Sequence, residues 1–373
     1  MTSKLAKDRI TGLLSIAGIS VNGNDPWDIQ VHNDNLYNRV LSGGSLALGE
    51  SYMEKWWDVE HPDEFFSRLL STNLDEIIKK SPKLIAEIAL TKILNYQTRS
   101  RALGNSFKHY DIGNDLFTKM LDKRLVYTCA YWKDAGTLED AQANKMDLAC
   151  RKLKLEPGMR MLDIGCGWGS FAKFAAEKYG VRVTGVSISE EQIHLGKILC
   201  NGLPVEIKNM DYRELDQKFD RISCFGMFEH VGQKNHRMYM QVVNRCLEDD
   251  GLFLLQTVGN PYTRTYPDPW LSKYIFPNCT VPSVTQIGKA IEGLFFIEDL
   301  HNFGPDYDKT LMAWHHNFIS NWDDLKDKYD ETFYRMWRYY LLSCAGGFRA
   351  KRNFLWQIVF SKRSRQGEYV AVR

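Results

Sequence analysis

The chain has 373 residues, 44% of them hydrophobic, which is enough for one large domain and a smaller one. Its formal net charge of +2 argues against a polyanion such as nucleic acid as the partner, and no apolar run reaches the ~20 residues that span a bilayer. The eight cysteines form no CxxC pair or other metal-ligand spacing, which argues against zinc. Several of them lie inside apolar runs, which is typical of reduced thiols in a cytoplasmic protein.

Two helices are predicted near the N-terminus. ITGLLSIAGISV (10–21) resembles a signal peptide, but it lacks a cleavage site and Asp8 precedes it, so we expect it to form the first helix. SPKLIAEIALTKILN (81–95) predicts a short amphipathic helix with Ser81 as N-cap and Pro82 at its first position. That helix could pack on the main domain or lie on a membrane surface.

Positive charge is concentrated in two blocks. Residues 79–108 and 349–373 each contain seven Lys or Arg against one acid. A solvated face and an anionic membrane surface both fit this pattern. The segment 260–283 is rich in aromatic residues, which favour the membrane interface, and it includes Tyr274.

From about residue 155, short apolar strands alternate with helical stretches. The predicted strands are GMRMLDIGCGWG, VRVTGVSIS, PVEIKNMD, FDRISCFGMF, GLFLLQTVG and, near the end, FLWQIVFSKR. Strand–helix alternation predicts an α/β fold with a mostly parallel sheet covered on both faces.

MLDIGCGWG (161–169) predicts a strand, a glycine-rich turn and a helix. Gly165 and Gly167 let the backbone turn tightly and approach a ligand closely. A dinucleotide loop would need a glycine where Ser170 stands. With Asp163 before it, the loop instead looks like the nucleoside-binding loop of S-adenosylmethionine methyltransferases, although an ordinary tight turn is the alternative.

Six segments in order resemble the cyclopropane-fatty-acyl-phospholipid synthases and the related mycolic acid cyclopropane synthases. They are HYDIGNDLF (109–117), YTCAYW (127–132), LDIGCGWG (162–169), GMFEHVG (226–232), DPWLSKYIFP (268–277) and FGPDYDKTLMAW (303–314). The long N-terminal portion favours the phospholipid branch, because the mycolic acid enzymes lack it. The resemblance implies a Rossmann-like methyltransferase domain with a seven-stranded sheet over residues 109–373, a linker at 96–108, and a smaller helical, lipid-associating domain at 1–95.

The implied reaction adds a methylene from S-adenosylmethionine across a cis double bond of a phospholipid acyl chain. The π-bond attacks the sulfonium methyl, a carbocation forms, and bound bicarbonate removes a proton so that the ring closes. By resemblance, Cys129, Glu229 and Tyr307 hold the bicarbonate, with help from the backbone at Val258. Gln256 stands where the family usually has histidine, and an amide can donate a hydrogen bond but cannot relay a proton as histidine can.

The resemblance also implies a set of cofactor-binding residues. They are Asp163, Gly165 and Gly167 in or before the glycine loop, Gln192 at the ribose, Tyr212 and Arg213 at the adenine, and Tyr127 and Thr128 capping the methionine. Tyr110 and Tyr274 could line the acyl channel, or Tyr110 could simply pack. HYDIGNDLF predicts a helix start capped by Asn114 or Asp115.

Several alternatives remain open from the sequence. His230 could act as a direct base, although a lone histidine at a strand end is more often structural. Cys129 could be a buried small hydrophobe. The chain could resolve the same cation into a methyl-branched or methylene product, methylate a small soluble nucleophile, or bind lipid without catalysis. The family also implies a homodimer at the inner face of the membrane, peripheral to the bilayer.

Overall fold

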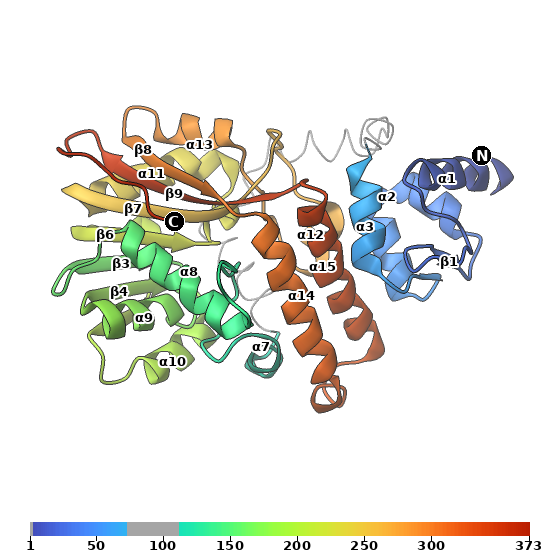
Figure 1. Ribbon diagram of the computed structural model, residues 1–373, viewed down its shortest axis with the longest axis horizontal. Helices are drawn as coiled ribbons and strands as arrows, with labels where there is room; N and C mark the ends of the chain where they lie inside the picture. Colours follow the sequence, from blue (N-terminus) through green and yellow to red (C-terminus); the bar gives the residue numbers. More distant parts are fainter. Residues whose placement is uncertain (1–2, 73–111) are drawn as a thin grey trace. The chain divides into compact units, whose positions relative to one another are not determined.

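The computed structural model describes residues 3–72 and 112–373 (Figure 1). The chain forms two compact units, each combining segments that are distant in sequence. The helical unit comprises Met1–Leu94, Thr265–Pro277 and Tyr307–Asn353, and the sheet unit comprises Asn95–Arg264, Asn278–Asp306 and Phe354–Arg373. The predicted linker at 96–108 and the helix predicted at 81–95 lie outside the described residues. The predicted domain boundaries therefore stay a prediction.

A seven-stranded sheet with the order β5-β4-β3-β6-β7-β9-β8 forms the centre of the sheet unit. Its strands are β3 Arg160–Ile164, β4 Arg182–Ser187, β5 Val205–Asn209, β6 Phe219–Phe225, β7 Leu247–Gly259, β8 Phe295–Asn302 and β9 Phe354–Lys362. The first five strands of that order are parallel, and β9 runs antiparallel to β7 and β8. The sequence predicts six of these strands but misses β8. Its apolar residues do not alternate cleanly, and its ladder shifts register between Ile297 and Asp299.

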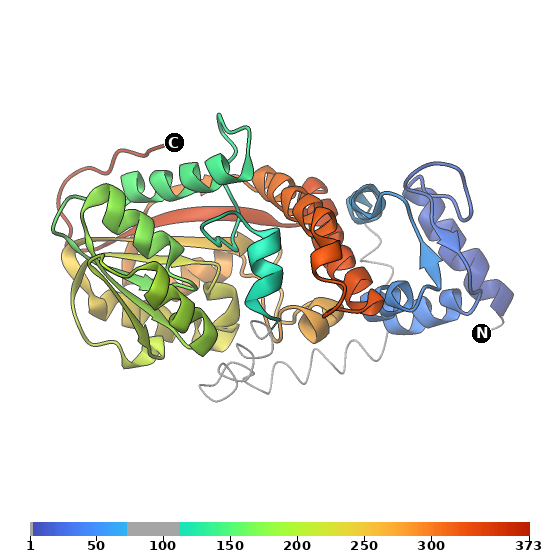
Figure 2. The same cartoon turned by 90° about the horizontal axis from the view of Figure 1, so that it is seen from below.

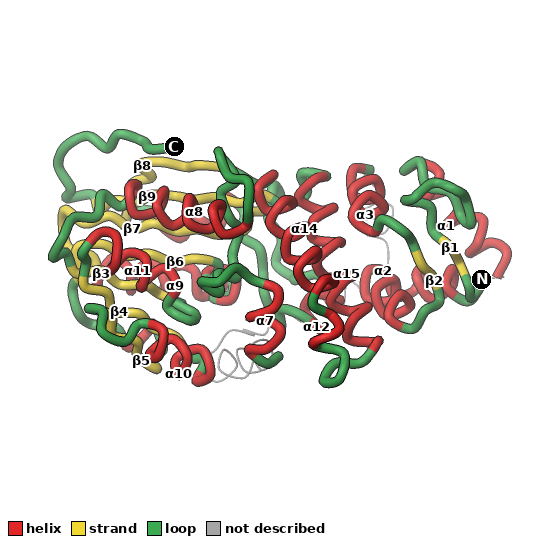
Figure 3. The backbone as a smooth tube through the Cα atoms, turned by 60° about the horizontal axis from the view of Figure 1, so that its bottom comes forward, coloured by secondary structure: helices red, strands yellow, loops and turns green. Residues whose placement is uncertain are grey.

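Helices cover both faces of this sheet, as predicted (Figure 3). The main helices of the unit are α7 Asn114–Met120, α8 Leu138–Lys152, α9 Ser170–Tyr179, α10 Glu190–Leu199, α11 His236–Cys246 and α13 Val284–Ile291. Leu162 and Ile164 of β3 join a core with α11 and α13, whereas Met161 joins a core with α8 and α9. Alternate strand residues therefore serve opposite faces, as the period of two in a strand requires.

The start of α7 differs from the prediction. Gly113 is the N-cap residue, and Asn114 is the first residue of the helix, so neither Asn114 nor Asp115 caps it. The Asn114 side chain instead accepts a hydrogen bond from the indole Nε1 of Trp168 at 3.1 Å. That contact ties α7 to the glycine loop and explains why the side chain is not available to the helix end.

The helical unit begins with a helix that starts before the predicted one, and residues 17–21 of the predicted helix are not helical. The elements of the unit are α1 Ser3–Ile16, β1 Gln30–Val31, α2 Leu36–Met53, β2 Trp57–Asp58, α3 Pro62–Ser71, α12 Pro269–Tyr274, α14 Pro305–Ser320, whose first two residues belong to the sheet unit, and α15 Glu331–Arg349. The helix α1, blue in Figure 2, ends at Ile16, before the left-handed Gly18. Aromatic rings form much of the core of this unit, and Trp270 packs against Tyr339 with ring centroids 4.4 Å apart.

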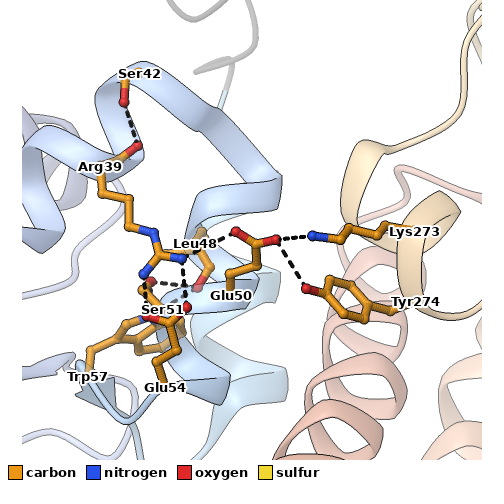
Figure 4. A network of polar contacts seen from close by, with 9 residues as sticks. All are labelled: Arg39, Ser42, Leu48, Glu50, Ser51, Glu54, Trp57, Lys273 and Tyr274. Carbon is orange, nitrogen blue, oxygen red and sulfur yellow. Dashed lines mark hydrogen bonds and ion pairs between the residues drawn. The ribbon is translucent and has the colours of Figure 1, made fainter.

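Glu50 of α2 joins two helices of the helical unit, α2 and α12 (Figure 4). Its carboxylate accepts from Arg39 of the same helix at 3.2 Å, from Lys273 at 2.6 Å and from the hydroxyl of Tyr274 at 3.0 Å. These cations and the hydroxyl hold the pKa of Glu50 below its usual value against the opposing effect of burial. The short helix α12 is therefore fastened to α2 by one charged side chain.

Candidate active site

The sheet unit brings most of the predicted site residues to one edge of its sheet. Parallel strands β5, β4, β3, β6 and β7 are successive neighbours, so their carboxyl ends meet at the same edge. The predicted residues that follow or end these strands are Tyr212 and Arg213 after β5, Gln192 after β4, Gly165 and Gly167 after β3, Glu229 after β6, and Gln256 and Val258 within the end of β7. The topology confirms that these residues share one edge, while their chemical roles stay predictions.

The glycine loop requires glycine at two positions for different reasons. Gly165 has φ +80°, and a Cβ placed there would lie 2.7 Å from the Cβ of Met227. Gly167 has φ +56°, and nothing in the described structure lies within 4 Å of its Cβ position. A close approach of the chain explains the first glycine, and open space above the backbone is what a ligand lying on the loop would need for the second.

Asp163 lies beneath the loop rather than in it. Its carboxylate is buried and accepts a hydrogen bond of 2.7 Å from the hydroxyl of Ser223 on β6. Burial raises the pKa of Asp163 to about 6, opposed by that hydrogen bond and by the charge of Lys145. In the described structure the side chain thus supports the ends of β3 and β6.

The residues predicted at the ribose and adenine are held differently from one another. Gln192 is buried in the first turn of α10. Tyr212 is also buried, in a 3₁₀ turn after β5, and burial raises the pKa of its phenol to about 12. Arg213 is fixed on Asp211, whose carboxylate accepts from the backbone and the guanidinium of Arg213 at 2.9 and 2.8 Å. The structure therefore offers a buried phenol and a fixed guanidinium after β5.

The segment Tyr127–Thr128–Cys129 is anchored by α8, which the sequence analysis did not include in the site. Lys145 Nζ donates to Thr128 Oγ1 at 2.9 Å, and Gln142 Nε2 donates to the Thr128 carbonyl at 2.8 Å. Lys145 is buried, and burial lowers its pKa to about 8 against the opposing charges of Asp122, Cys129 and Asp163.

The helical pattern of α8 held a signal for these anchoring residues. Gln142 and Lys145 are polar, yet they lie on the same apolar helix face as Leu138, Ala141 and Ala149. Polar side chains on a buried face need partners there, so they indicate a specific polar contact. The sequence analysis made no prediction for this helix.

Glu229 is a buried carboxylate in the 3₁₀ turn Phe228–His230. Its Oε1 accepts from the backbone N–H of Val258 at 2.7 Å, and among the described residues its Oε2 has no hydrogen-bond partner. Burial raises the pKa of Glu229 to about 7, although the Val258 N–H opposes the shift. Near neutral pH this carboxyl can therefore either donate or accept a proton.

Gln256 connects Glu229 to Cys129 through β7. The Gln256 carbonyl accepts from Gly226, which precedes the turn that carries Glu229. The Gln256 side chain donates from Nε2 to the Cys129 carbonyl over a long 3.5 Å. Cys129 itself is fully buried and its thiol donates to the Ala130 carbonyl. The buried residues that carry a carboxyl, an amide and a thiol are thus linked by hydrogen bonds through Gln256, and together they could hold a small ion.

The remaining candidates are His230, Tyr307, Tyr274 and Tyr110. Burial lowers the pKa of His230 to about 4, so its imidazole is neutral and weakly basic at neutral pH. Tyr307 belongs to the helical unit, where its ring packs 4.7 Å from that of Phe348, and Tyr274 in the same unit donates to Glu50. Tyr110 lies outside the described residues. Roles for these tyrosines stay predictions.

The donor set at the sheet edge fits both groups that the resemblance implies. The Cβ position of Gly167, which no described residue approaches within 4 Å, and the buried Gln192 and Tyr212 suit the nucleoside and amino-acid portions of S-adenosylmethionine. The Glu229 Oε2 without a partner in the described structure suits a small oxyanion that carries a hydroxyl.

Comparison with known proteins identifies the family of the chain. Residues 97–358 match the family model described as mycolic acid cyclopropane synthetase. The chain is 50% identical over 359 residues to the cyclopropane-fatty-acyl-phospholipid synthase of Escherichia coli strain K12, covering 96% of this chain and 94% of that protein. It is also 34% identical to a probable fatty acid methyltransferase of Pseudomonas putida, over 70% of each chain.

A solved structure shares the fold. A mycolic acid cyclopropane synthase complexed with SAH and CTAB is 31% identical and superposes with a TM-score of 0.65, covering 70% of this chain and 98% of that one. The predicted fold class, a seven-stranded methyltransferase sheet with a helical N-terminal region, is confirmed by this likeness and by the sheet itself.

Proposed function

The chain belongs to the mycolic acid cyclopropane synthetase family, and as its substrate we propose the cis double bond of an unsaturated acyl chain in a membrane phospholipid. It is an S-adenosylmethionine-dependent transferase, and the proposal concerns its acceptor, its product and its base. We propose a cyclopropane fatty acid as the product and a bound bicarbonate as the general base. The likeness to the phospholipid enzyme of E. coli over nearly the whole chain supports the choice of acceptor.

One observation carries the proposed base: Glu229, a buried carboxyl whose pKa is raised to about 7 by burial and whose Oε2 has no partner among the described residues. When bound, S-adenosylmethionine supplies an electrophilic methyl group and bicarbonate supplies a small base. Glu229 would accept the hydroxyl proton of the anion and so orient its other oxygens. The amide of Gln256 would donate to the anion, and the buried Cys129 would close the pocket without exposing a thiolate to an alkylating cofactor.

Peripheral contact with the bilayer is part of the proposal. Within residues 3–72 and 112–373, no helix is long and apolar enough to cross a membrane. Five of the seven basic residues at 349–373 already bond inside the chain: Arg349, Arg352, Lys362, Arg365 and Arg373. We propose that basic residues of both blocks, 79–108 and 349–373, attract anionic lipid, with Tyr262, which is 60% exposed, as an aromatic contact. A homodimer at the inner face of the membrane completes the proposal.

The decisive experiment incubates the full chain with methyl-labelled S-adenosylmethionine and vesicles of unsaturated phospholipid, in buffer with and without bicarbonate. NMR of the extracted lipid detects the high-field protons of a cyclopropane ring. We expect ring formation that depends on bicarbonate and on vesicles. Ring formation at the same rate in bicarbonate-free buffer would remove the anion from the mechanism, and label in a water-soluble product would remove the lipid.

A methyl-branched or methylene product is the second candidate. Gln256 favours it, because an amide cannot relay a proton as histidine can, and so proton removal from the intermediate could take another course. The probable fatty acid methyltransferase among the relatives also supports it. The same NMR spectrum separates the two, since a methyl branch gives no high-field ring protons.

A further inference from the structure

Three polar side chains lie in a row across the neighbouring strands β7, β9 and β8, beginning with Gln256 on β7. In the register of β7, β9 and β8, Gln256 lies opposite Gln357, and Gln357 lies opposite His301. Directly paired residues point to the same face of a sheet, so these three share one face. Gln357 is fully buried, and its Nε2 donates to Gln256 Oε1 at 2.9 Å. Nothing in the proposed reaction uses Gln357.

The orientation of this amide pair follows from one fixed acceptor. Gln256 faces the carbonyl of Cys129, and a carbonyl can only accept. That carbonyl is held in place because Gln142 bonds the Thr128 carbonyl on one side and the Tyr131 N–H bonds the Ala141 carbonyl on the other. Gln256 must therefore turn its nitrogen toward Cys129 and its oxygen toward Gln357.

We propose that Gln357 is a positioning residue, which fixes the Gln256 amide with its N–H side toward Cys129 and the candidate anion site. The anion itself rests on the proposed function, whereas the orientation of the amide does not. A nitrogen carries two hydrogens, so after bonding the Cys129 carbonyl Gln256 keeps a second N–H for a ligand. The bond to Cys129 is long, at 3.5 Å, and alone would hold the amide weakly. The 2.9 Å bond from Gln357 supplies the stronger restraint.

The groups that face Gln357 allow this role over the pH range of an assay. His301 on β8 is paired through Nδ1 with Lys152 of α8 at 3.1 Å. Burial lowers the pKa of His301 to about 4, so the ring stays neutral, and it lowers the pKa of Lys152 to about 7 against the charge of Asp299. Lys152 therefore titrates within the assay range, which requires every variant to be compared with wild type at the same pH.

Two substitutions separate orientation from packing. Gln357→Glu places a carboxylate, which only accepts, opposite Gln256 and forces that amide to turn its nitrogen away from Cys129. Gln357→Met keeps the size but removes the donor, leaving Cys129 alone to orient Gln256. At pH 8.5 we expect kcat/KM to fall about five-fold in the Met variant and about ten-fold further in the Glu variant. The half-saturating bicarbonate concentration rises in the same order, while the KM for S-adenosylmethionine stays within about two-fold.

The Glu variant also carries a pH signature that a packing defect would not show. A protonated carboxyl can donate to Gln256 Oε1 and restore the original orientation. The activity of Gln357→Glu relative to wild type should therefore rise as the pH falls from 8.5 to 6.5. Ser361→Ala, which removes the hydrogen bond from β9 to Glu298, is the matched control and should stay near wild-type activity at every pH. A flat ratio for the Glu variant, or a Met variant at least as damaged, would overturn the proposal.

A double-mutant cycle tests the pair even if the proposed lipid activity fails. Gln256→Met, Gln357→Met and the double variant are unfolded in urea. We expect a coupling equivalent to about a five-fold change in the unfolding equilibrium constant. Coupling near zero overturns the positioning role whatever the enzyme does. Coupling with no bicarbonate dependence in the wild type sustains the orientation of the amide and rejects only the proposed base.

Discussion

The two halves of the candidate site are built from different materials. The proposed cofactor half centres on backbone, because Gly165 and Gly167 adopt left-handed conformations in one short loop after β3, and it adds the buried side chains of Gln192 and Tyr212. The half proposed to hold an anion depends on buried side chains from distant parts of the chain, with Cys129 before α8, Glu229 after β6 and Gln256 in β7. A site formed by backbone loses binding when a side-chain atom is added to a glycine. A site formed by side chains loses it when a charge or a hydrogen-bond donor is changed.

The largest effect is expected from Gly165→Ala. Alanine would have to adopt a φ of +80°, and its Cβ would lie 2.7 Å from the Cβ of Met227, so the loop must move. We expect SAH to bind at least about 100-fold more weakly by calorimetry, because loop amides lose their positions. Gly158→Ala is the control, since its φ is +86° but nothing lies within 4 Å of its Cβ position. It should cost about 1 kcal/mol of stability without weakening SAH; equal binding losses in both variants would refute the steric argument.

Glu229→Gln should impair the side-chain half of the site and leave cofactor binding at the glycine loop unchanged. The amide keeps the acceptor for the Val258 N–H but replaces a proton-accepting oxygen with an N–H donor. We expect kcat to fall about 100-fold, the scale of one acid–base contribution, while SAH binds as in wild type. Coupled loss of SAH binding would show that the two halves are not separable.

The same substitution gives a pH-dependent change in stability. Burial raises the pKa of Glu229 from 4.5 to about 7, so its favourable contribution is complete below pH 4.5 and is lost as the pH rises through 7. Glutamine does not titrate, so Glu229→Gln should gain stability relative to wild type across that window. The gain reaches at most about 3 kcal/mol at pH 8. Urea unfolding at pH 5 and pH 8 measures it, and parallel pH curves for the two proteins would contradict the raised pKa.

The contrast also explains what the sequence could reveal. The glycine loop and six of the strands were predictable because they are local patterns of apolar and glycine residues. Glu229 and Cys129 could be named only through resemblance, since nothing in the sequence alone brings residues 100 positions apart together. Lys145 and Gln357 were missed because their partners, Thr128 and Gln256, lie in distant segments and are set by the packing and register of the fold. The N-cap prediction for α7 was wrong because the Asn114 side chain accepts a tertiary hydrogen bond from Trp168.

A smaller effect is expected from Cys129→Ala. The thiol is buried and donates to the adjacent Ala130 carbonyl, so in the proposed cage it is one of several groups around the anion. We expect kcat to fall about ten-fold, less than for Glu229→Gln, with the half-saturating bicarbonate concentration raised. Cys129→Ser, which keeps a donor, is the matched variant and should retain more activity. Unchanged turnover in the alanine variant would remove Cys129 from the site.

Gln256→His should have the smallest effect, and its sign is informative. An imidazole has one nitrogen that can accept from Gln357 and another that can donate toward Cys129, so it can reproduce both bonds of the amide. It adds the ability to pass a proton, which the amide lacks. Turnover measured in the vesicle assay should therefore equal or exceed that of wild type, with SAH affinity unchanged because β7 lies apart from the glycine loop. A strong loss would mean that this chain arranges its buried side chains around the amide of Gln256. The side-chain half of the site would then differ from that of the relatives, whereas the glycine loop keeps the family pattern.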